Sequence, residues 1–395
     1  MTYRGHLVVD ADCHIREYWD LDRTYKNHVA PEYREAYARF SEAVRAAQRR
    51  PGDVGFESVY SHPPLRSLGI YDLVEGPPSA GSGDGGGSSN RTRISNGRAV
   101  DPACNWDPSA RLRDMDEAAI DVGVLFSSQA DNLCMLPDVG FEHALHAAYH
   151  RYTHAFCSES DGRLRWLSNA TMRDIGATCA DLTYWAERDG NYAGVFITRR
   201  LLDGKLLDSP ELYPLWQRSE HLDLPIWIHG DPDHPPLTPG YDSLEWAAFA
   251  RGVLKGWGGQ TAMGALIGGG VFDLFPRLRI GFFENGAGWM PWFVEKLDES
   301  YRPGSSSTPK LKRKPSEIVG GGQIFCAIDP GEAELGHCID RLGENIWLFS
   351  TDYPHPPAAW PDDVSMIANR AEISESAKIR ILGGNARSFL PRLGV

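Results

Sequence analysis

The chain has 395 residues, of which 42% are hydrophobic and 24% charged, and its formal net charge at pH 7 is −13. These proportions are typical of a globular protein with a sizeable core, whereas the negative charge argues against nucleic acid or an anionic membrane as a partner. Because no apolar run reaches membrane-spanning length, no secretory leader is recognisable and the seven cysteines are scattered, we expect a cytoplasmic protein.

Apolar segments that end at polar or charged residues recur along the chain, and most are separated by segments with a helical pattern. Continuous apolar strands that alternate with helices are typical of a parallel sheet covered by helices, and eight such units predict an α/β fold, a closed (β/α)8 barrel. A doubly wound open sheet is the alternative, although no GxGxxG motif follows the first strand. The predicted strands are 7–14, 121–129, 164–172, 192–200, 224–233, 279–288, 323–330 and 345–356.

A long segment separates the first two predicted strands. We predict that residues 15–104 form an insertion over the barrel mouth, and that residues 1–14 and 105–395 form the barrel. Within the insertion, the Gly/Ser-rich stretch at about 76–98 predicts a flexible loop. An idle linker and a lid or partner contact are both consistent with this composition.

Carboxylates and imidazoles stand where four of the predicted strands end. In a barrel these ends meet at one mouth, and Asp12 and His14, two residues apart, point the same way. Carboxylates gathered there would repel one another unless a cation compensates their charge, and a mixed nitrogen and oxygen set suits Zn, Mn or Fe. The residues in question are Asp12, His14, Glu17, His229, His234, Glu284, Asp352 and His355.

Four motifs, DADCH, PIWIHGD, FFENGAGW and LFSTDYPHP, follow one another in this order. Together they resemble the amidohydrolase superfamily, in the branch similar to aminocarboxymuconate-semialdehyde and resorcylate decarboxylases. The resemblance covers 7–14 and roughly 105–395 and implies a metal-dependent (β/α)8 barrel of the hydrolase type. It implies that the metal ligands are Asp12, His14, His229 and Asp352. The decarboxylases carry a catalytic histidine at the end of the sixth strand, where this chain has Glu284.

The surplus of carboxylates predicts a second metal. We predict three further ligands, Glu17, Glu284 and His355, and one possible ligand, His234. These side chains together exceed what one metal ion with an open coordination position needs. Carboxylate-rich di-iron centres use ligand sets of this size. The chain thus resembles the dinuclear non-haem iron monooxygenases of this superfamily, which include a diterpenoid hydroxylase. That resemblance implies two Fe ions, O₂ and an electron donor, and hydroxylation of an apolar natural-product intermediate.

Two other functions remain open. The first is a mononuclear Zn- or Mn-dependent decarboxylase or hydrolase, in which Glu284 or Asp352 acts as general base. The second is a non-catalytic barrel that partners a catalytic subunit, against which the intact ligand set argues. In either enzyme we expect Glu284, Asp352 and His355 to be the catalytic groups.

The substrate pocket is predicted from aromatic and basic residues near the strand ends. Trp257 and Trp289 are expected to line an apolar pocket, and Arg199 and Lys255 to bind a carboxylate or thioester group, although structural roles for them are equally consistent. The family resemblance further implies a homodimer.

Overall fold

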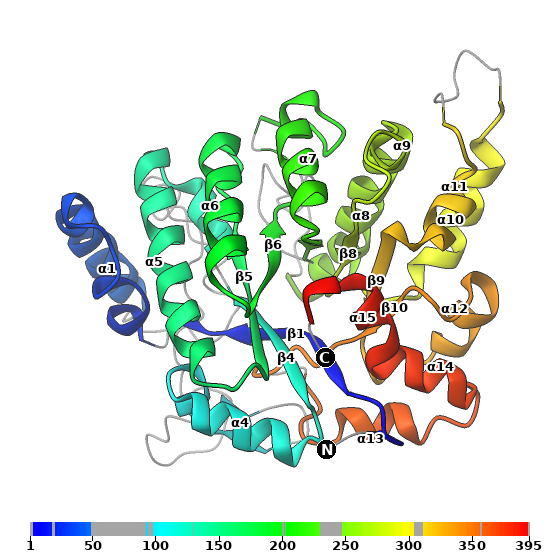
Figure 1. Cartoon of the computed structure of the whole chain (residues 1–395), viewed down its shortest axis with the longest axis horizontal. Helices are drawn as coiled ribbons and strands as arrows, with labels where there is room; N and C mark the ends of the chain where they lie inside the picture. Colours follow the sequence, from blue (N-terminus) through cyan, green and yellow to red (C-terminus); the bar gives the residue numbers. More distant parts are fainter. Residues whose placement is uncertain are drawn as a thin grey trace.

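The computed structural model describes residues 3–17, 20–48, 92–93, 98–128, 130–199, 201, 203–229, 247–303, 311–355 and 358–393. Within these residues, eight parallel strands form one sheet in which each strand pairs with the next along the chain (Figure 1). Each predicted strand segment overlaps one of them, so the expected eight-stranded α/β architecture is confirmed. The strands are β1 (Val9–Ile15), β4 (Val122–Ser127), β5 (Leu164–Asn169), β6 (Tyr192–Ile197), β7 (Ile226–Ile228), β8 (Ile280–Phe282), β9 (Ile324–Ile328) and β10 (Trp347–Phe349).

Contacts between β1 and the segment after β10 close the sheet into a barrel. Cys13 forms a parallel bridge with Tyr353, and the His14 N–H donates to the Tyr353 carbonyl at 2.8 Å. The Asp352 N–H donates to the Asp12 carbonyl at 3.0 Å. These hydrogen bonds rule out the open doubly wound sheet. Because they run through Asp12, His14 and Asp352, barrel closure also brings the polar ends of the first and last strands together.

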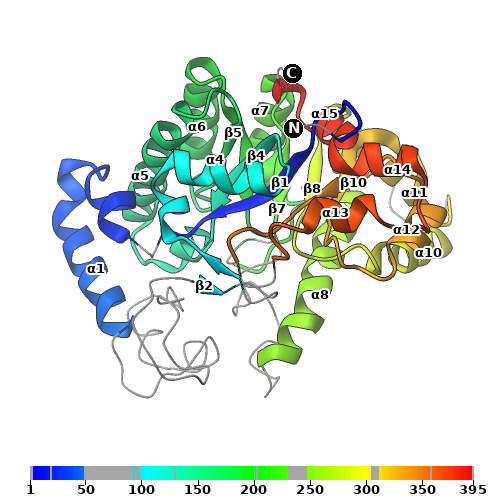
Figure 2. The same ribbon diagram turned by 90° about the horizontal axis from the view of Figure 1, so that it is seen from below.

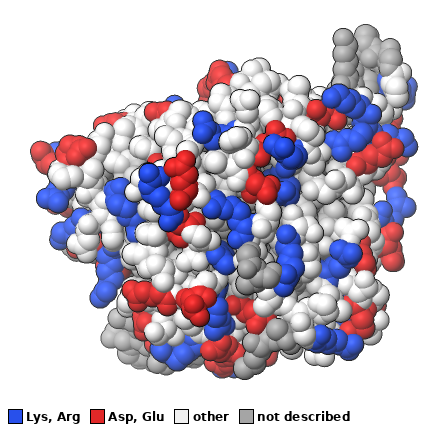
Figure 3. Space-filling view, viewed as in Figure 1, with Lys and Arg blue, Asp and Glu red and all other residues white. Residues whose placement is uncertain are grey.

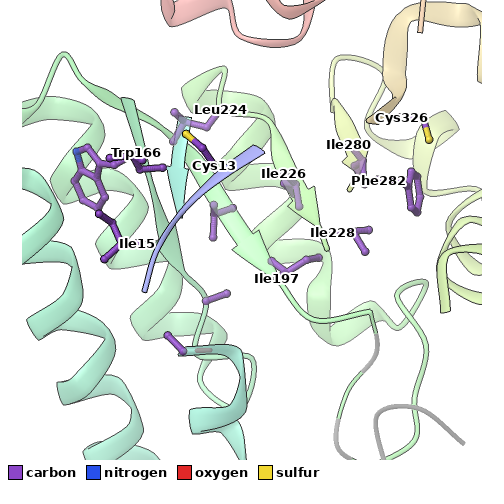
Figure 4. Close-up of a cluster of buried hydrophobic side chains, with 14 of the residues drawn as sticks. Cys13, Ile15, Trp166, Ile197, Leu224, Ile226, Ile228, Ile280, Phe282 and Cys326 are labelled. Atoms are coloured by element: carbon purple, nitrogen blue, oxygen red, sulfur yellow. The ribbon is translucent and has the colours of Figure 1, made fainter. Parts of the chain in front are cut away.

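A β-bulge in β1 sets the direction of its side chains. The pairing of β1 with β4 shifts register between Asp10 and Cys13. Before the bulge, Val9 and Ala11 pack into the barrel interior. After it, Cys13 and Ile15 pack in the layer between strands and helices (Figure 4). A bulge re-aims the residues that follow it, so Asp12 and His14 face the barrel mouth.

β8 and β10 end well before their predicted segments, because the backbone turns at residues that carry chemistry. β8 ends at Phe282 and β10 at Phe349, whereas the predicted segments ran to 288 and 356. Beyond them, Glu284 has φ 52° and Asp352 has φ 58°. This left-handed conformation is uncommon for residues other than glycine and cannot continue a strand.

Helices surround the barrel on its outer face (Figures 1 and 2). Side chains of Asp107, Asp138 and Asp174 accept backbone N–H groups at the first turns of three of them and so satisfy donors that the helix leaves free. The helices are α4 (Pro108–Glu117), α5 (Val139–Ser158), α6 (Ile175–Arg188), α7 (Tyr213–Leu222), α8 (Ala247–Gly268), α9 (Val271–Leu274), α10 (Trp289–Ser300), α11 (Pro315–Ile318), α12 (Leu335–Leu342), α13 (Asp363–Ala368), α14 (Glu375–Ile379) and α15 (Asn385–Phe389).

The described part of the predicted insertion packs against α5. It contains the turn Asp22–Lys26, the helix α1 (Arg34–Gln48) and the short strands β2 (Thr92–Arg93) and β3 (Ala99–Val100). The rings of Tyr33 and Phe40 each lie 6.0 Å from the ring of Phe141, and α1 flanks α5 in Figure 2. Most of the Gly/Ser-rich stretch at about 76–98 lies outside the described residues, so its role as a loop and the domain boundaries stay predictions.

The surface agrees with the mixed composition of the chain. Basic and acidic side chains are interspersed over the face shown in Figure 3. Among the described helices, none is both long enough and apolar enough to cross a membrane.

Candidate active site

A cluster of buried ligand atoms occupies the barrel mouth. Nε2 of His14 lies 3.1 Å from Oδ1 of Asp12 and 3.2 Å from Oδ1 of Asp352. Nε2 of His229, from the end of β7, lies 3.9 Å from Oδ2 of Asp12. The ligand atoms of Asp12, His14 and His229 all lie within 4.8 Å of one another, as do those of His14, Asp352 and His355. The strand ends therefore converge as the sequence predicts.

The donor set fits a divalent metal ion. Asp12, His14 and His229 are at most 4% exposed, and two carboxylates meet within hydrogen-bonding distance of one imidazole nitrogen. Neither Oδ1 of Asp12 nor Nε2 of His14 makes a hydrogen bond of good geometry in the described chain. Buried charges are stable when they are paired or bind a metal, and this mixture of imidazole and carboxylate suits Zn or Mn.

The electrostatics of His14 follow from the same two carboxylates. Burial alone would lower the pKa of His14, but Asp12 and Asp352 outweigh burial and raise this pKa well above its ordinary value. Burial would likewise raise the pKa of Asp352, but His355 and His14 hold it well below its usual range. Without a metal, the cluster therefore keeps a proton on His14, which a cation must displace.

His355 positions Asp352. Nδ1 of His355 lies 2.6 Å from Oδ1 of Asp352, and Nε2 of His355 lies 2.9 Å from Oγ of Ser128. The His355 ring stacks on the ring of His14 with centroids 4.2 Å apart. Both ring nitrogens of His355 therefore have protein partners, and the side chain orients Asp352 against the cluster.

Glu284 lies beside the cluster and is paired with a positively charged side chain. Oε2 of Glu284 lies 3.5 Å from Nε2 of His229, and Oε1 forms an ion pair with Nζ of Lys255 from α8. Nη1 of Arg199 donates to the Lys255 carbonyl at 3.4 Å. A Cβ at Gly258 would lie 1.8 Å from Nη1 of Arg199, so only glycine lets this turn of α8 lie so close to the Arg199 side chain. Arg199 thus holds the backbone that presents Lys255.

Two predicted ligands are placed elsewhere or are not described. Glu17 is 1% exposed, and its Oε2 accepts the Ser128 N–H at 2.9 Å. Among the described residues, Glu17 belongs to neither group of converging ligand atoms. His234 lies outside the described residues.

A cavity of about 560 Å³ opens beside the cluster. Of the residues predicted to bind substrate, Lys255 and Trp289 line its wall, whereas Trp257 is 56% exposed on α8 and is not among the described lining residues. Glu284, Asn285, Asp329, Thr351, Asp352 and Asp363 also contribute to the wall.

Sequence reasoning missed Asp329. This residue follows directly after β9, in the predicted strand segment QIFCAIDP. Its side chain lines the cavity, where the surrounding protein and the charges of Asp352 and Asp12 raise its pKa to about 6. The sequence did contain a signal for Asp329, because this residue follows an apolar strand segment as Asp352 does. QIFCAIDP has no histidine or second carboxylate, however, that would have marked it as a candidate site.

Comparison with known proteins agrees with this geometry. The model of the family described as Amidohydrolase matches residues 9–392. The chain belongs to the amidohydrolase family. It is 26% identical, over 74% of this chain and 79% of the relative, to a 2-amino-3-carboxymuconate-6-semialdehyde decarboxylase of Dictyostelium discoideum. It is 28% identical, over 46% of this chain and 55% of the relative, to a gamma-resorcylate decarboxylase of a Polaromonas species.

Solved structures support the fold of this amidohydrolase-family chain. A 5-carboxyvanillate decarboxylase of Novosphingobium aromaticivorans, complexed with manganese and 4-hydroxy-3-methoxy-5-nitrobenzoic acid, superposes with a TM-score of 0.67. The superposition covers 100% of this chain and 98% of the other at 18% sequence identity. The (β/α)8 barrel is therefore shared, and the metal that accompanies it in that relative is manganese.

The comparisons overturn the prediction of a dinuclear iron monooxygenase. The curated relatives are decarboxylases, which are carboxy-lyases and not oxygen-dependent oxidoreductases. Counting carboxylates near strand ends overestimated the metal site, because it ignored their partners in space. Glu17 accepts a backbone N–H and Glu284 pairs with Lys255. The alternative prediction, a mononuclear metal enzyme of the decarboxylase type, is the better supported one.

Proposed function

We propose that this protein is a carboxy-lyase that removes CO₂ from a small organic acid with one Mn²⁺ or Zn²⁺ ion and without O₂. The observation that carries the proposal is the buried cluster of Asp12, His14, His229 and Asp352 beside a cavity of about 560 Å³. Such a volume is within the range of small-molecule sites. The decarboxylase relatives support the same reaction class.

The four cluster residues would hold the metal, which would supply Lewis acidity to orient the substrate carboxylate and stabilise negative charge. His14 and His229 contribute neutral nitrogens once the proton on His14 is lost. Asp352 is kept in place by His355 at 2.6 Å. The substrate acid then lies along the cavity, with its reacting carbon towards Glu284 and Lys255.

Proton delivery is assigned to the Lys255–Glu284 pair. In decarboxylation the bond between the substrate carbon and its carboxylate breaks, CO₂ leaves, and the electron pair stays on the carbon, which then takes a proton. The pair lies at the cavity wall next to His229 and holds a proton on the Lys255 ammonium group. Lys255 would give this proton to the carbon, and water would restore it.

The experiment is a CO₂-release assay without oxygen. Purified protein loaded with Mn²⁺ is incubated anaerobically with a panel of hydroxybenzoates and unsaturated dicarboxylates, and CO₂ and product are quantified. We expect turnover, and a decrease of kcat of about a hundredfold or more in Glu284→Gln, the usual contribution of general acid–base catalysis.

The matched control is Glu299→Gln, which disrupts the exposed Lys296–Glu299 pair on α10 and should leave turnover unchanged. A strict requirement for O₂ would contradict the proposal. Unchanged kcat in Glu284→Gln would remove Glu284 from the proton-delivery step, and unchanged kcat in Lys255→Met would remove Lys255.

A further inference from the structure

The cavity wall has more negative than positive groups. Glu284, Asp329, Asp352 and Asp363 line it, against Lys255 as the basic residue of its described wall. Two of these acids have partners. Asp352 belongs to the ligand cluster, and Glu284 pairs with Lys255. A metal ion would compensate the cluster, and burial raises the pKa of Asp363 to about 7, so the charge that is not yet balanced belongs chiefly to Asp329.

Asp329 presents its carboxylate to the cavity. The residue is exposed, and no side chain or N–H group of the described chain donates a hydrogen bond to its carboxylate. Lys255 acts on Asp329 electrostatically, but its ammonium group is held by Glu284. Within the described part of the chain, the carboxylate of Asp329 therefore faces the cavity without a contacting counter-charge.

Two buried acceptors in the same wall also lack donors. Asp363 is 1% exposed, and one of its oxygens accepts the Ala359 N–H at 3.1 Å, while Oδ2 has no partner among the described residues. Asn285 is 8% exposed and donates to the Phe283 carbonyl, while its Oδ1 has no partner in the same described set. Buried acceptors without donors are rare and destabilising. Among the described residues of the wall, these two acceptors stand against one buried donor without a partner, Nε1 of Trp289, and against one basic side chain, Lys255.

We propose that the substrate is a carboxylic acid that also carries a protonated amine, and that Asp329 recognises this ammonium group. The proposal rests on the proposed function for the reacting end, where the carboxylate meets the metal centre. An ammonium group on the substrate would offer the positive charge that no described side chain places against the Asp329 carboxylate. A second carboxylate in the same position would be repelled by Asp329, which makes this residue a determinant of specificity.

The test compares para-substituted benzoates that differ at one group. The probes are 4-(aminomethyl)benzoate, 4-(hydroxymethyl)benzoate, 4-methylbenzoate and terephthalate, and their binding to the full-length Mn²⁺-loaded protein is measured by calorimetry at pH 7.5. We expect the aminomethyl probe to bind about tenfold more tightly than the hydroxymethyl probe, the magnitude of a charge-assisted hydrogen bond. Terephthalate should bind most weakly.

Asp329→Asn should reduce the affinity for the aminomethyl probe to that for the hydroxymethyl probe. Asp340→Asn, an exposed aspartate on α12, is the matched control and should keep the preference. Equal affinities for the aminomethyl and methyl probes would overturn the proposal, as would a preference that survives in Asp329→Asn.

The two proposals can fail separately. An Asp329-dependent preference for the amine in a protein that releases CO₂ from no acid would support the recognition of the ammonium group and contradict the proposed decarboxylation. Release of CO₂ from acids with and without an amine at equal kcat/KM would support the proposed reaction and overturn the role of Asp329.

Discussion

At the scale of single residues, the site depends on local backbone geometry as much as on residue type. Glu284 and Asp352 both leave their strands with positive φ values. Each such residue costs on the order of 1 kcal/mol or more, and strain of this kind persists mainly where function requires it. The turn directs Asp352 towards His14 and Glu284 towards His229. A strand that simply continued would place neighbouring side chains on alternate faces instead.

Metal binding should compete with protonation of His14. Because Asp12 and Asp352 raise the pKa of His14, the metal-free protein carries a proton there that a metal must displace. We expect Mn²⁺ binding near neutral pH to release about one proton per site and to weaken as pH falls. Calorimetric titrations in buffers of different ionisation enthalpy measure the number of protons released.

Asp12→Asn should weaken Mn²⁺ binding by at least about a hundredfold, since even residues outside the ligand shell contribute up to that factor. Asp116→Asn, a change on the outer helix α4, provides the comparison. In the buffer series with the parent protein, an Mn²⁺-binding enthalpy that is the same in every buffer would contradict the proton assigned to metal-free His14.

At the scale of elements, α5 shows how the same residue type serves structure instead of catalysis. Nε2 of His146 donates to the Ala130 carbonyl at 3.0 Å, and Nε2 of His150 accepts the Asn169 N–H at 2.9 Å. Both side chains are at most 1% exposed. Burial lowers the pKa of His146 to about 4 and that of His150 well below its ordinary value. These histidines bridge α5 to neighbouring segments in their neutral form.

The pH dependence of stability should report these histidines. Below about pH 6.5 the unfolded chain binds a proton at each histidine, whereas folded His146 stays neutral down to about pH 4. The free energy of unfolding therefore falls as pH decreases through this window, by about 1.4 kcal/mol per pH unit for each histidine. Urea denaturation at pH 7, 6 and 5 measures this slope.

Other titrating groups contribute to the pH dependence of the free energy of unfolding with the opposite sign. The contribution of His146 is therefore measured by comparing variants. His146→Gln should reduce the slope between pH 6 and pH 5 by up to about 1.4 kcal/mol per pH unit. His337→Gln, at an exposed position of α12, should leave it unchanged. Identical slopes in His146→Gln and the parent protein would mean that folded His146 takes up a proton.

At the scale of the whole molecule, the C-terminal helix α15 contributes a side chain to the core inside the barrel. Phe389 of α15 is fully buried, and its ring lies 4.6 Å from the ring of Trp227 and 5.0 Å from that of Phe325. A Cβ on Gly281 would lie 2.8 Å from Cζ of Phe389, so this glycine makes room for the ring. Residues distant in sequence thus complete one core.

Phe389→Ala should reduce the free energy of unfolding by about 3–5 kcal/mol, as expected when a large buried ring is removed. Metal affinity should change little, because Phe389 packs against the rings of Trp227 and Phe325 and supplies no ligand atom. Chemical denaturation measures the first quantity and Mn²⁺ titration the second. Leu274→Ala, at a 55% exposed side chain, should cost well under 1 kcal/mol. A similar loss in both variants would contradict the role assigned to Phe389.

The predicted homodimer stays a prediction.

The sequence by itself determined the barrel and the residues of its mouth. Apolar runs that stop at Asp12, His14, His229 and Asp352 locate the ends of parallel strands, and parallel strand ends must meet at one edge. Side-chain direction was predicted correctly for Asp12 and His14, although a bulge in β1 that no local pattern indicates is what turns them into the mouth.

Only the tertiary structure decided which acids belong together. Glu17 precedes the barrel's second strand by more than a hundred residues, yet it hydrogen-bonds the Ser128 N–H just beyond that strand. Glu284 acquires its counter-charge from Lys255 on α8, whereas no described side chain places a contacting counter-charge on Asp329 at the wall of the cavity. Charge compensation depends on distances in space between segments that are remote along the chain. A count of carboxylates therefore predicted two metals, where the folded arrangement supports one.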